Sequence, residues 1–311
     1  MIQLCKLVLK NYCGYKKFEK KFKRNDVIPP WIILYGPNGI GKSNLLNAIE
    51  MLSNPWRYKH NTSGVFFRKL TYSDNYNPSY EGFDNKLTDL YMEAIFSING
   101  QDKKVIIENH WKKKLEYSEI YEKEIITARQ DEEKSGIIVD ELSNSVSNYI
   151  NADNQIDIQR FQLKSEYKNL FLEMAKIIYG FDCELPENSL VEGVINREEQ
   201  KKENLFFYTD FVLNKFNTKV HFKRFSAGEK KIATMLRKLF NDVYDYNSKK
   251  ILLIDNITMH VYFDRHLKMI KKIKECFPDN QIITTTHSPE IIKKMPKEYL
   301  IDMYKELKNN N

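Results

Sequence analysis

Apolar and polar residues alternate along the first segment of the chain, up to a short apolar run at residues 32–35. Apolar residues then recur at helical spacing, at Leu45, Leu46, Ile49 and Leu52. A glycine-rich turn separates the two patterns. A strand is therefore predicted to pass through a tight turn into an amphipathic helix.

The middle of the chain has two different patterns. Residues 92–98 alternate, a hairpin turn follows at Asn99 and Gly100, and residues 105–107 return, so an antiparallel β segment is expected at about 85–110. Residues 111–205 are charged and irregular, with one helical face and no sustained heptads. A compact helical insertion is expected there, without a long coiled coil.

The last third of the chain alternates helical and strand patterns. Apolar residues predict helices at about 232–243 and 267–277 and strands at 251–254 and 281–286. Helices that alternate with buried strands indicate a largely parallel sheet. The predicted fold class is α/β with a mixed or parallel core sheet.

Composition narrows the class of protein. The chain has 311 residues, of which 42% are hydrophobic and 29% charged, so a folded core is expected. Its net charge of +7 is weak support for a polyanionic partner. No apolar run approaches the ~20 residues of a membrane span, and the N-terminus lacks a secretory pattern, so a cytoplasmic protein without membrane contact is expected. The four scattered cysteines are expected to be buried thiols.

The glycine-rich turn fits the pattern G-x-x-x-x-G-K-[ST] between a predicted strand and a predicted helix. Backbone N–H groups of such a loop converge on phosphate oxygens, and the helix N-terminus adds positive potential. Lys42 is expected to reach the β and γ phosphates and Ser43 to bind Mg²⁺ with its hydroxyl, so ATP and Mg²⁺ are the expected ligands. The candidate ATP contacts are Gly36, Pro37, Asn38, Gly39, Ile40, Gly41, Lys42, Ser43 and Asn44.

Three further positions are chemically suggestive. Asp255 ends a buried strand, where open α/β sheets bind ligands, and it would hold Mg²⁺ opposite Ser43. His287 follows another strand, where it would contact the γ-phosphate or polarise water, or else be structural. Ser226 precedes a helix with Glu229 three residues later, which by itself is a capping box.

In this order the motifs resemble those of the non-transporter ABC ATPases, the heads related to RecF and the structural-maintenance-of-chromosomes (SMC) proteins, and especially the overcoming-lysogenization-defect type. Residues 225–231, F-S-A-G-E-K-K, are similar to the family's signature motif, usually L-S-G-G-Q. Residues 283–289 are similar to its switch-histidine strand, T-T-H-S-P. The resemblance implies that Ser226, Gly228 and Glu229 contact ATP held by a second head and that His287 is catalytic.

The resemblance also implies one ABC-type ATPase head over residues 1–311. Its core lobe would come from about 1–60 and 215–311, with an antiparallel β segment at about 85–110 and an irregular or helical insertion at about 111–205. The residues after Asp255 do not follow the transporter pattern, which weighs against transport.

One position departs from the family. The residue after the metal-binding aspartate is usually a glutamate that activates water, whereas this chain has Asn256. An amide cannot accept a proton at neutral pH, so Asn256 would orient a water without acting as its base. Slow ATP hydrolysis is therefore predicted.

The leading hypothesis is an ATP-gated switch that forms a homodimer, or a higher homo-oligomer, by sandwiching ATP between two heads. The overcoming-lysogenization-defect type commonly carries a nuclease domain after the switch histidine, whereas this chain ends shortly after His287, so a separate effector, such as a nuclease, is expected. By resemblance, that arrangement fits the ATPase subunit of a bacterial anti-phage defence system. Two alternatives stay open: a scaffold locked by ATP without turnover, and a repair head that acts on DNA. The basic and aromatic residues 111–117 keep a nucleic-acid partner open, although such runs are usually solvated.

Overall fold

The fold is built around a parallel five-stranded sheet, seen in a computed structural model of the chain. The sheet has the order β15-β3-β14-β13-β6, and every pairing in it is parallel. The strands are β3 (Trp31–Tyr35), β6 (Ile150–Asn151), β13 (Ile251–Asp255), β14 (Gln281–Thr286) and β15 (Leu300–Asp302). The structure describes residues 2–23, 26–53, 90–109, 150–151, 162–164, 167–186, 190–195, 202–207, 211–240 and 251–310.

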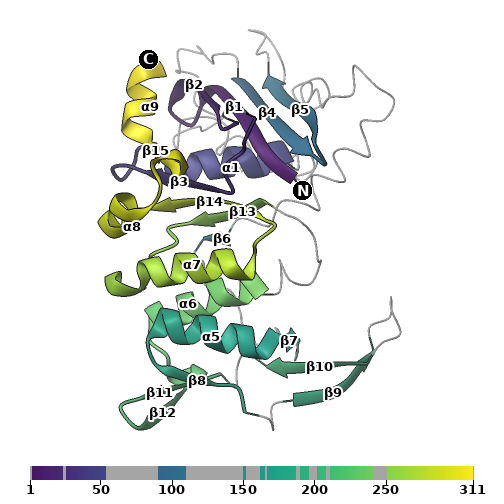
Figure 1. Ribbon diagram of the computed structural model, residues 1–311, viewed down its shortest axis with the longest axis vertical. Helices are drawn as coiled ribbons and strands as arrows, with labels where there is room; N and C mark the ends of the chain where they lie inside the picture. The colour runs from purple at the N-terminus through teal and green to yellow at the C-terminus, as the bar shows by residue number, and fades with distance from the viewer. Residues whose placement is uncertain are drawn as a thin grey trace, which may run out of the picture.

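A second sheet covers one face of the core. Its order is β2-β1-β4-β5, all antiparallel, and α1 (Lys42–Ser53) lies between the two sheets (Figure 1). The predicted hairpin forms here: Ile98 pairs with Gln101, and Asn99 and Gly100 have φ of +51° and +85°. The strands are β1 (Ile2–Tyr12), β2 (Tyr15–Lys21), β4 (Leu90–Ile98) and β5 (Gln101–Asn109).

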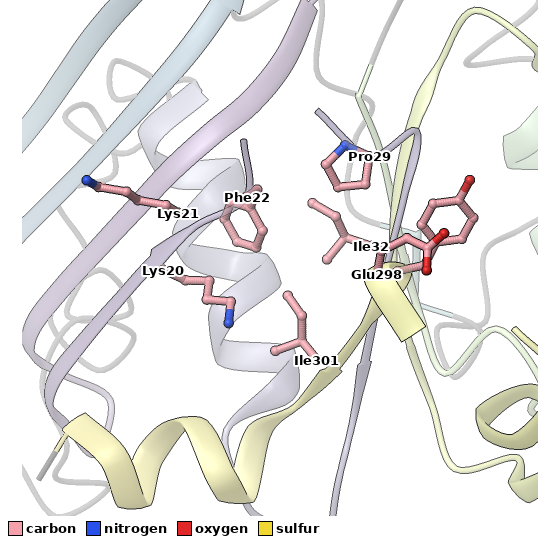
Figure 2. A pocket seen from close by; sticks show the side chains of 8 residues that line it. Lys20, Lys21, Phe22, Pro29, Ile32, Glu298 and Ile301 are labelled. Carbon is pink, nitrogen blue, oxygen red and sulfur yellow. The ribbon is translucent and has the colours of Figure 1, made fainter. Parts of the chain in front are cut away.

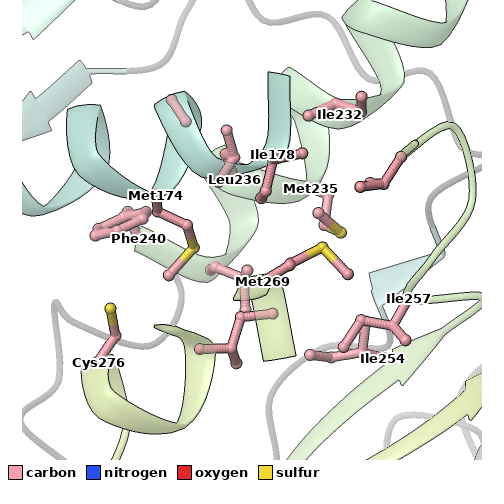
Figure 3. Close-up of a cluster of buried hydrophobic side chains, with 14 of the residues drawn as sticks. Met174, Ile178, Ile232, Met235, Leu236, Phe240, Ile254, Ile257, Met269 and Cys276 are labelled. Atoms are coloured by element: carbon pink, nitrogen blue, oxygen red, sulfur yellow. The ribbon is translucent and has the colours of Figure 1, made fainter. Parts of the chain in front are cut away.

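Helices cover the opposite face of the core sheet. They are α5 (Lys168–Tyr179), α6 (Ala227–Lys238) and α7 (His266–Cys276) (Figure 1). Figure 3 shows apolar side chains of these helices, among them Met174, Leu236 and Met269, in one cluster with Ile254 of the sheet. Residues 241–250, which include the predicted end of the helix at 232–243, lie outside the described residues.

Strand residues of the core sheet alternate between the two hydrophobic clusters. Trp31 and Ile33 of β3 pack toward α5, α6 and α7, whereas Ile32 and Leu34 pack toward α1 and the antiparallel sheet. Both faces are therefore buried, which explains the continuous apolar runs at residues 31–34 of β3 and 251–254 of β13. The predicted α/β class with a parallel core sheet is confirmed.

Two smaller antiparallel sheets lie beyond α5. Their orders are β7-β10-β9 and β12-β11-β8. Several of their strands fall within residues 111–205, so the described part of that segment contains strands as well as α5; its division from the core lobe stays a prediction. The strands are β7 (Gln162–Lys164), β8 (Asp182–Glu184), β9 (Leu190–Ile195), β10 (Lys202–Phe207), β11 (Val212–Lys215) and β12 (Thr218–His221).

Short elements complete the fold. The 3-10 helices are η6 (Phe222–Arg224), η9 (Phe263–Arg265) and η10 (Lys297–Tyr299), and the last two α-helices are α8 (Pro289–Lys294) and α9 (Met303–Asn310). None of the helices in the described residues is long and apolar enough to cross a membrane. The cysteines are free thiols; Cys5 and Cys276 are buried as predicted, whereas Cys13 and Cys183 are only half-buried.

A buried glutamine joins the antiparallel sheet to the core sheet. The Gln281 side chain is fully buried, and its Oε1 accepts the backbone N–H of Leu4 at 2.6 Å. Its Nε2 donates to the carbonyl oxygens of Leu4 at 3.5 Å and Pro29 at 3.2 Å. The contact connects β1 to the start of β14 across 277 positions of sequence.

Candidate functional site

The glycine-rich loop joins the carboxyl end of β3 to the first turn of α1. Gly41 has φ of +98°, and a β-carbon there would lie 2.6 Å from the Tyr15 hydroxyl oxygen. That hydroxyl donates a hydrogen bond of 2.7 Å to the Gly41 carbonyl oxygen. Only glycine fits this position, because both the backbone angle and the close tyrosine exclude a side chain. The following turn is also held, since the Asn44 amide donates to the Cys13 carbonyl at 3.3 Å.

Lys42 is folded back over the loop. Lys42 is only 6% exposed, and its Nζ donates to the carbonyl oxygens of Gly36 at 3.0 Å and Pro37 at 2.8 Å. Burial lowers the pKa of Lys42, and the Asp255 carboxylate opposes that shift. An ammonium held by neutral carbonyls can exchange them for phosphate oxygens, which are stronger acceptors.

Asp255 is buried at the carboxyl end of β13, with 2% exposure. Its carboxylate accepts a hydrogen bond from the Thr285 hydroxyl of the neighbouring strand β14. The same hydroxyl oxygen accepts the backbone N–H of Asn256 at 2.7 Å. Thr285 thus positions both the aspartate and the residue after it.

Asn256 begins a tight turn after β13. Its φ is +50°, and its carbonyl oxygen accepts the Met259 N–H at 2.8 Å. Among residues with a side chain, asparagine tolerates this left-handed backbone well. The turn ends near His260, which also has a positive φ, of +65°. The local backbone therefore gives Asn256 a structural reason to be asparagine, independent of chemistry.

His287 lies directly after β14, with an exposed side chain. Partial burial lowers the pKa of His287, the Lys42 ammonium lowers it further, and the Asp255 carboxylate opposes both. Lys42, Asp255 and His287 therefore interact electrostatically. They follow three strands that are neighbours in the core sheet, where Thr286 pairs with Tyr35 and Thr284 with Ile254. The imidazole is neutral at pH 7, so it can accept a proton or hydrogen bond.

Ser226 caps α6 as the sequence pattern predicts. Its hydroxyl oxygen accepts the Glu229 backbone N–H at 3.3 Å, while Glu229 Oε2 accepts the Ser226 backbone N–H at 2.8 Å. The Ser226 hydroxyl also donates to Glu229 Oε2 at 2.9 Å. Gly228 in the same turn faces His260, because a β-carbon added there lies 3.4 Å from the His260 Nδ1 atom. The capping turn thus lies next to the turn that follows Asp255.

Several residues of this region were missed by sequence reasoning. Thr285 falls inside the stretch 283–289 that the sequence singles out and Tyr15 inside the alternating first segment, but nothing in either pattern predicts their hydrogen bonds. Lys215 forms an ion pair with Glu229, and the buried Tyr179 hydroxyl donates to the Glu229 carbonyl oxygen at 2.7 Å. These two contacts depend on the packing of α5 and β11 against α6, and no local signal marks them.

Mg²⁺ fits the chemistry of the predicted donors. It prefers oxygen ligands and usually combines one or two protein groups with phosphate oxygens and water. The Ser43 hydroxyl and the Asp255 carboxylate are donors of this kind. Within the described part of the chain no group of three or more His, Cys, Asp or Glu side chains could hold a metal by itself.

A small hollow elsewhere in the molecule is lined by residues of β2, β3 and β15 and their flanks (Figure 2). Lys20, Phe22 and Ile301 are among its walls. With about 10 Å³ of free space it has room for about one water molecule, too little for a nucleotide. The predicted basic segment at 111–117 lies outside the described residues.

Comparison with known proteins finds a matching family and similar proteins. The profile of the family described as "AAA domain, putative AbiEii toxin, Type IV TA system" matches residues 32–293. The Septu protein PtuA of Bacillus mycoides is 21% identical over 271 residues, which are 84% of this chain and 34% of that protein. The Septu protein PtuA of Bacillus thuringiensis is 28% identical over 95 residues, 27% of this chain and 24% of that protein. The chain thus spans about a third or less of the length of these relatives.

Solved structures show the same fold at low identity. The SMC head domain from Thermotoga maritima is 15% identical with a TM-score of 0.52, covering 94% of this chain and 91% of that one. The Smc head domain with an extended coiled coil, bound to the C-terminal domain of ScpA and derived from Pyrococcus furiosus, is 14% identical with a TM-score of 0.52. It covers 96% of this chain and 91% of that one. The predicted head fold is confirmed.

Proposed function

Because this chain belongs to the family described as "AAA domain, putative AbiEii toxin, Type IV TA system", we propose that it is a slow ATPase that closes on a second copy when ATP is bound. Closure would switch a separate effector protein, such as a nuclease, in bacterial defence against phage. The likeness to Septu PtuA proteins supports the setting in defence. The single-head organisation over residues 1–311, with its core lobe and insertion, is part of the same proposal.

The convergence of Lys42, Asp255 and His287 carries the proposal. They follow β3, β13 and β14, neighbouring parallel strands whose carboxyl ends lie at one edge of the core sheet. Each side chain acts electrostatically on another of the set. A cation, a carboxylate and a neutral imidazole beside a phosphate loop are the groups needed to bind and hydrolyse a triphosphate.

The roles follow from the donors and acceptors of each residue. Lys42 would release the carbonyl oxygens of Gly36 and Pro37 and bind the β and γ phosphates. Ser43 and Asp255 would hold Mg²⁺, which neutralises phosphate charge when it is bound. His287, neutral at pH 7, would accept a hydrogen bond from the attacking water or contact the γ-phosphate. Asn256 has no group that accepts a proton, so we expect slow turnover.

A second copy would complete the site. Ser226 and Gly228 at the start of α6 offer a hydroxyl and backbone N–H groups, as helix N-termini do for anions. In the proposed sandwich they contact ATP held by Lys42 and Ser43 of the other copy, and Glu229 lies in the same turn. Nucleotide binding would then be coupled to dimerisation, which is the step that an effector can sense.

The proposal is tested by measuring the protein's mass and phosphate release in parallel. Wild type should be a monomer without nucleotide and a dimer with ATP and Mg²⁺, and should release phosphate slowly. Lys42→Ala should do neither, and Gly228→Asp should bind ATP but stay monomeric.

Each other outcome points to a different function. A stable ATP dimer that never releases phosphate would indicate a scaffold, and duplex DNA binding that weakens with salt and is stimulated by ATP would indicate a DNA-acting head. A wild type that binds ATP and stays monomeric at all concentrations would refute the switch.

A further inference from the structure

The capping turn of α6 carries a carboxylate where the proposed function needs a phosphate to bind. Glu229 Oε2 lies 2.9 Å from the Ser226 hydroxyl oxygen, the group expected to contact ATP of the second copy. Hydrogen bonds from Lys215 and Ser226 outweigh the effect of partial burial and hold the pKa of Glu229 below its ordinary value. Glu229 is therefore ionised at neutral pH. A bare negative charge at this distance would repel an incoming phosphate.

Lys215 supplies the opposite charge. Its ammonium pairs with Glu229 Oε1, and the two side chains are 23% and 18% exposed, so solvent screens the pair only in part. The ammonium also lies over the Phe181 ring, 5.6 Å from its centroid. Lys215 is thus held between an aromatic ring and the carboxylate.

The backbone fixes Lys215 in this place. Lys215 is the last residue of β11 and pairs with Thr218 of β12 across a turn formed by Phe216 and Asn217. Both turn residues have positive φ, of +46° and +63°, as in the tightest hairpins. The hairpin therefore fixes the register of β11 against β12, and Lys215 lies at the end of a paired strand.

We propose that Lys215 is a positioning residue for closure, which neutralises Glu229 so that the Ser226 hydroxyl can donate a hydrogen bond to the phosphate of ATP bound to a second copy. This inference rests on the proposed function, because it assigns a role within the sandwich. In the isolated copy the Ser226 hydroxyl donates to Glu229. On closure the hydroxyl turns to the phosphate, and Lys215 retains the carboxylate. Lys215 acts through Glu229 and does not itself touch the phosphate.

Charge-balanced variants test the proposal. The ATP concentration at which half of the protein is dimeric is measured by analytical ultracentrifugation at one protein concentration. Lys215→Met should raise it at least about tenfold, because an unpaired carboxylate then faces the phosphate. Glu229→Gln should lower it, because the repelling charge is gone while the Lys215 ammonium remains. Lys215→Met combined with Glu229→Gln should return to within about twofold of wild type, because the double variant removes both charges, and Lys215→Arg should stay close to wild type.

Lys219→Met is the matched control. Lys219 is on the neighbouring strand β12 and pairs with Glu184 at 2.7 Å instead of with Glu229, so its loss should leave closure unchanged. Binding of a fluorescent ATP analogue to the monomer should be equal in all variants, because the phosphate loop is untouched.

Two results overturn the inference alone while wild type still dimerises. In one, the double variant is as impaired as Lys215→Met, which means that Lys215 acts on the phosphate or on the fold. In the other, Lys215→Met behaves as Lys219→Met does. A wild type that does not dimerise with ATP overturns the proposed function, and this inference with it.

Discussion

Replacing Gly41 with alanine isolates the contact that Tyr15 makes with the phosphate loop. A β-carbon on Gly41 would lie 2.6 Å from the Tyr15 hydroxyl oxygen and 2.9 Å from the ring carbon that carries it. Tyr15 is 2% exposed and packs against Phe18 with ring centroids 5.5 Å apart. The ring therefore has little room to move away, and the added methyl group must displace the loop.

Gly39 provides a matched control within the same loop. Its φ is +76°, but nothing lies within 4 Å of a β-carbon added there. Left-handed backbone costs a residue with a side chain about 1–2 kcal/mol, and both variants carry that cost. Overpacking adds about 1–3 kcal/mol for Gly41→Ala alone. We expect losses in the free energy of unfolding of about 1–2 kcal/mol for Gly39→Ala and about 2–5 kcal/mol for Gly41→Ala.

The free energies are measured by urea denaturation without nucleotide, followed by the fluorescence of the tryptophans, which include the buried Trp31. Equal losses in the two variants would show that Tyr15 does not limit the space at Gly41. A third variant sharpens the result: Tyr15→Phe in the Gly41→Ala background removes the closer of the two contacts, so it should recover part of the difference. If it lowers stability by as much as Tyr15→Phe does in wild type, the steric account is wrong.

Three further predictions follow from the site. Asn256→Glu should speed phosphate release by supplying a base. Because glutamate tolerates the left-handed backbone less well than asparagine, the free energy of unfolding measured in urea should fall by about 1 kcal/mol. An unchanged rate in a folded variant contradicts the missing-base account. Because the pKa of His287 lies below its ordinary value, the ring loses its proton at a lower pH than a free histidine. Phosphate release should therefore be constant above neutrality and fall on acidification, and His287→Ala should lack that acidic fall. Tyr179→Phe leaves the Glu229 carbonyl oxygen without its 2.7 Å partner, so unfolding should become easier by about 1–3 kcal/mol; no change would mean that water replaces the hydroxyl.

The parts of the site that are local in sequence could be predicted from it. The phosphate loop is one contiguous run, and its strand and helix are marked by apolar spacing. Asp255 was found because a buried strand ends there, and Ser226 because a capping box needs only four consecutive residues. In each case the physical requirement is met within one turn of chain, so a single sequence is sufficient.

The contacts between distant segments could not be predicted in the same way. Thr285 and Asp255 are 30 positions apart and meet only because β13 and β14 are neighbours in the sheet. Lys215 reaches Glu229 because a hairpin brings the end of β11 to the start of α6. The pattern of apolar residues predicts strands but gives neither their order in a sheet nor the side chains that face each other across it.

The Gln281 contact indicates where the chain can tolerate insertions. The hydrogen bond between residues 4 and 281 closes a loop that contains the segments between them, in the sense in which polymer theory uses the word. Closing such a loop becomes only about 0.6 kcal/mol harder for each doubling of its length. Insertions between these two positions should therefore cost little stability, whereas replacing the glutamine should weaken the attachment of β1 to the core sheet.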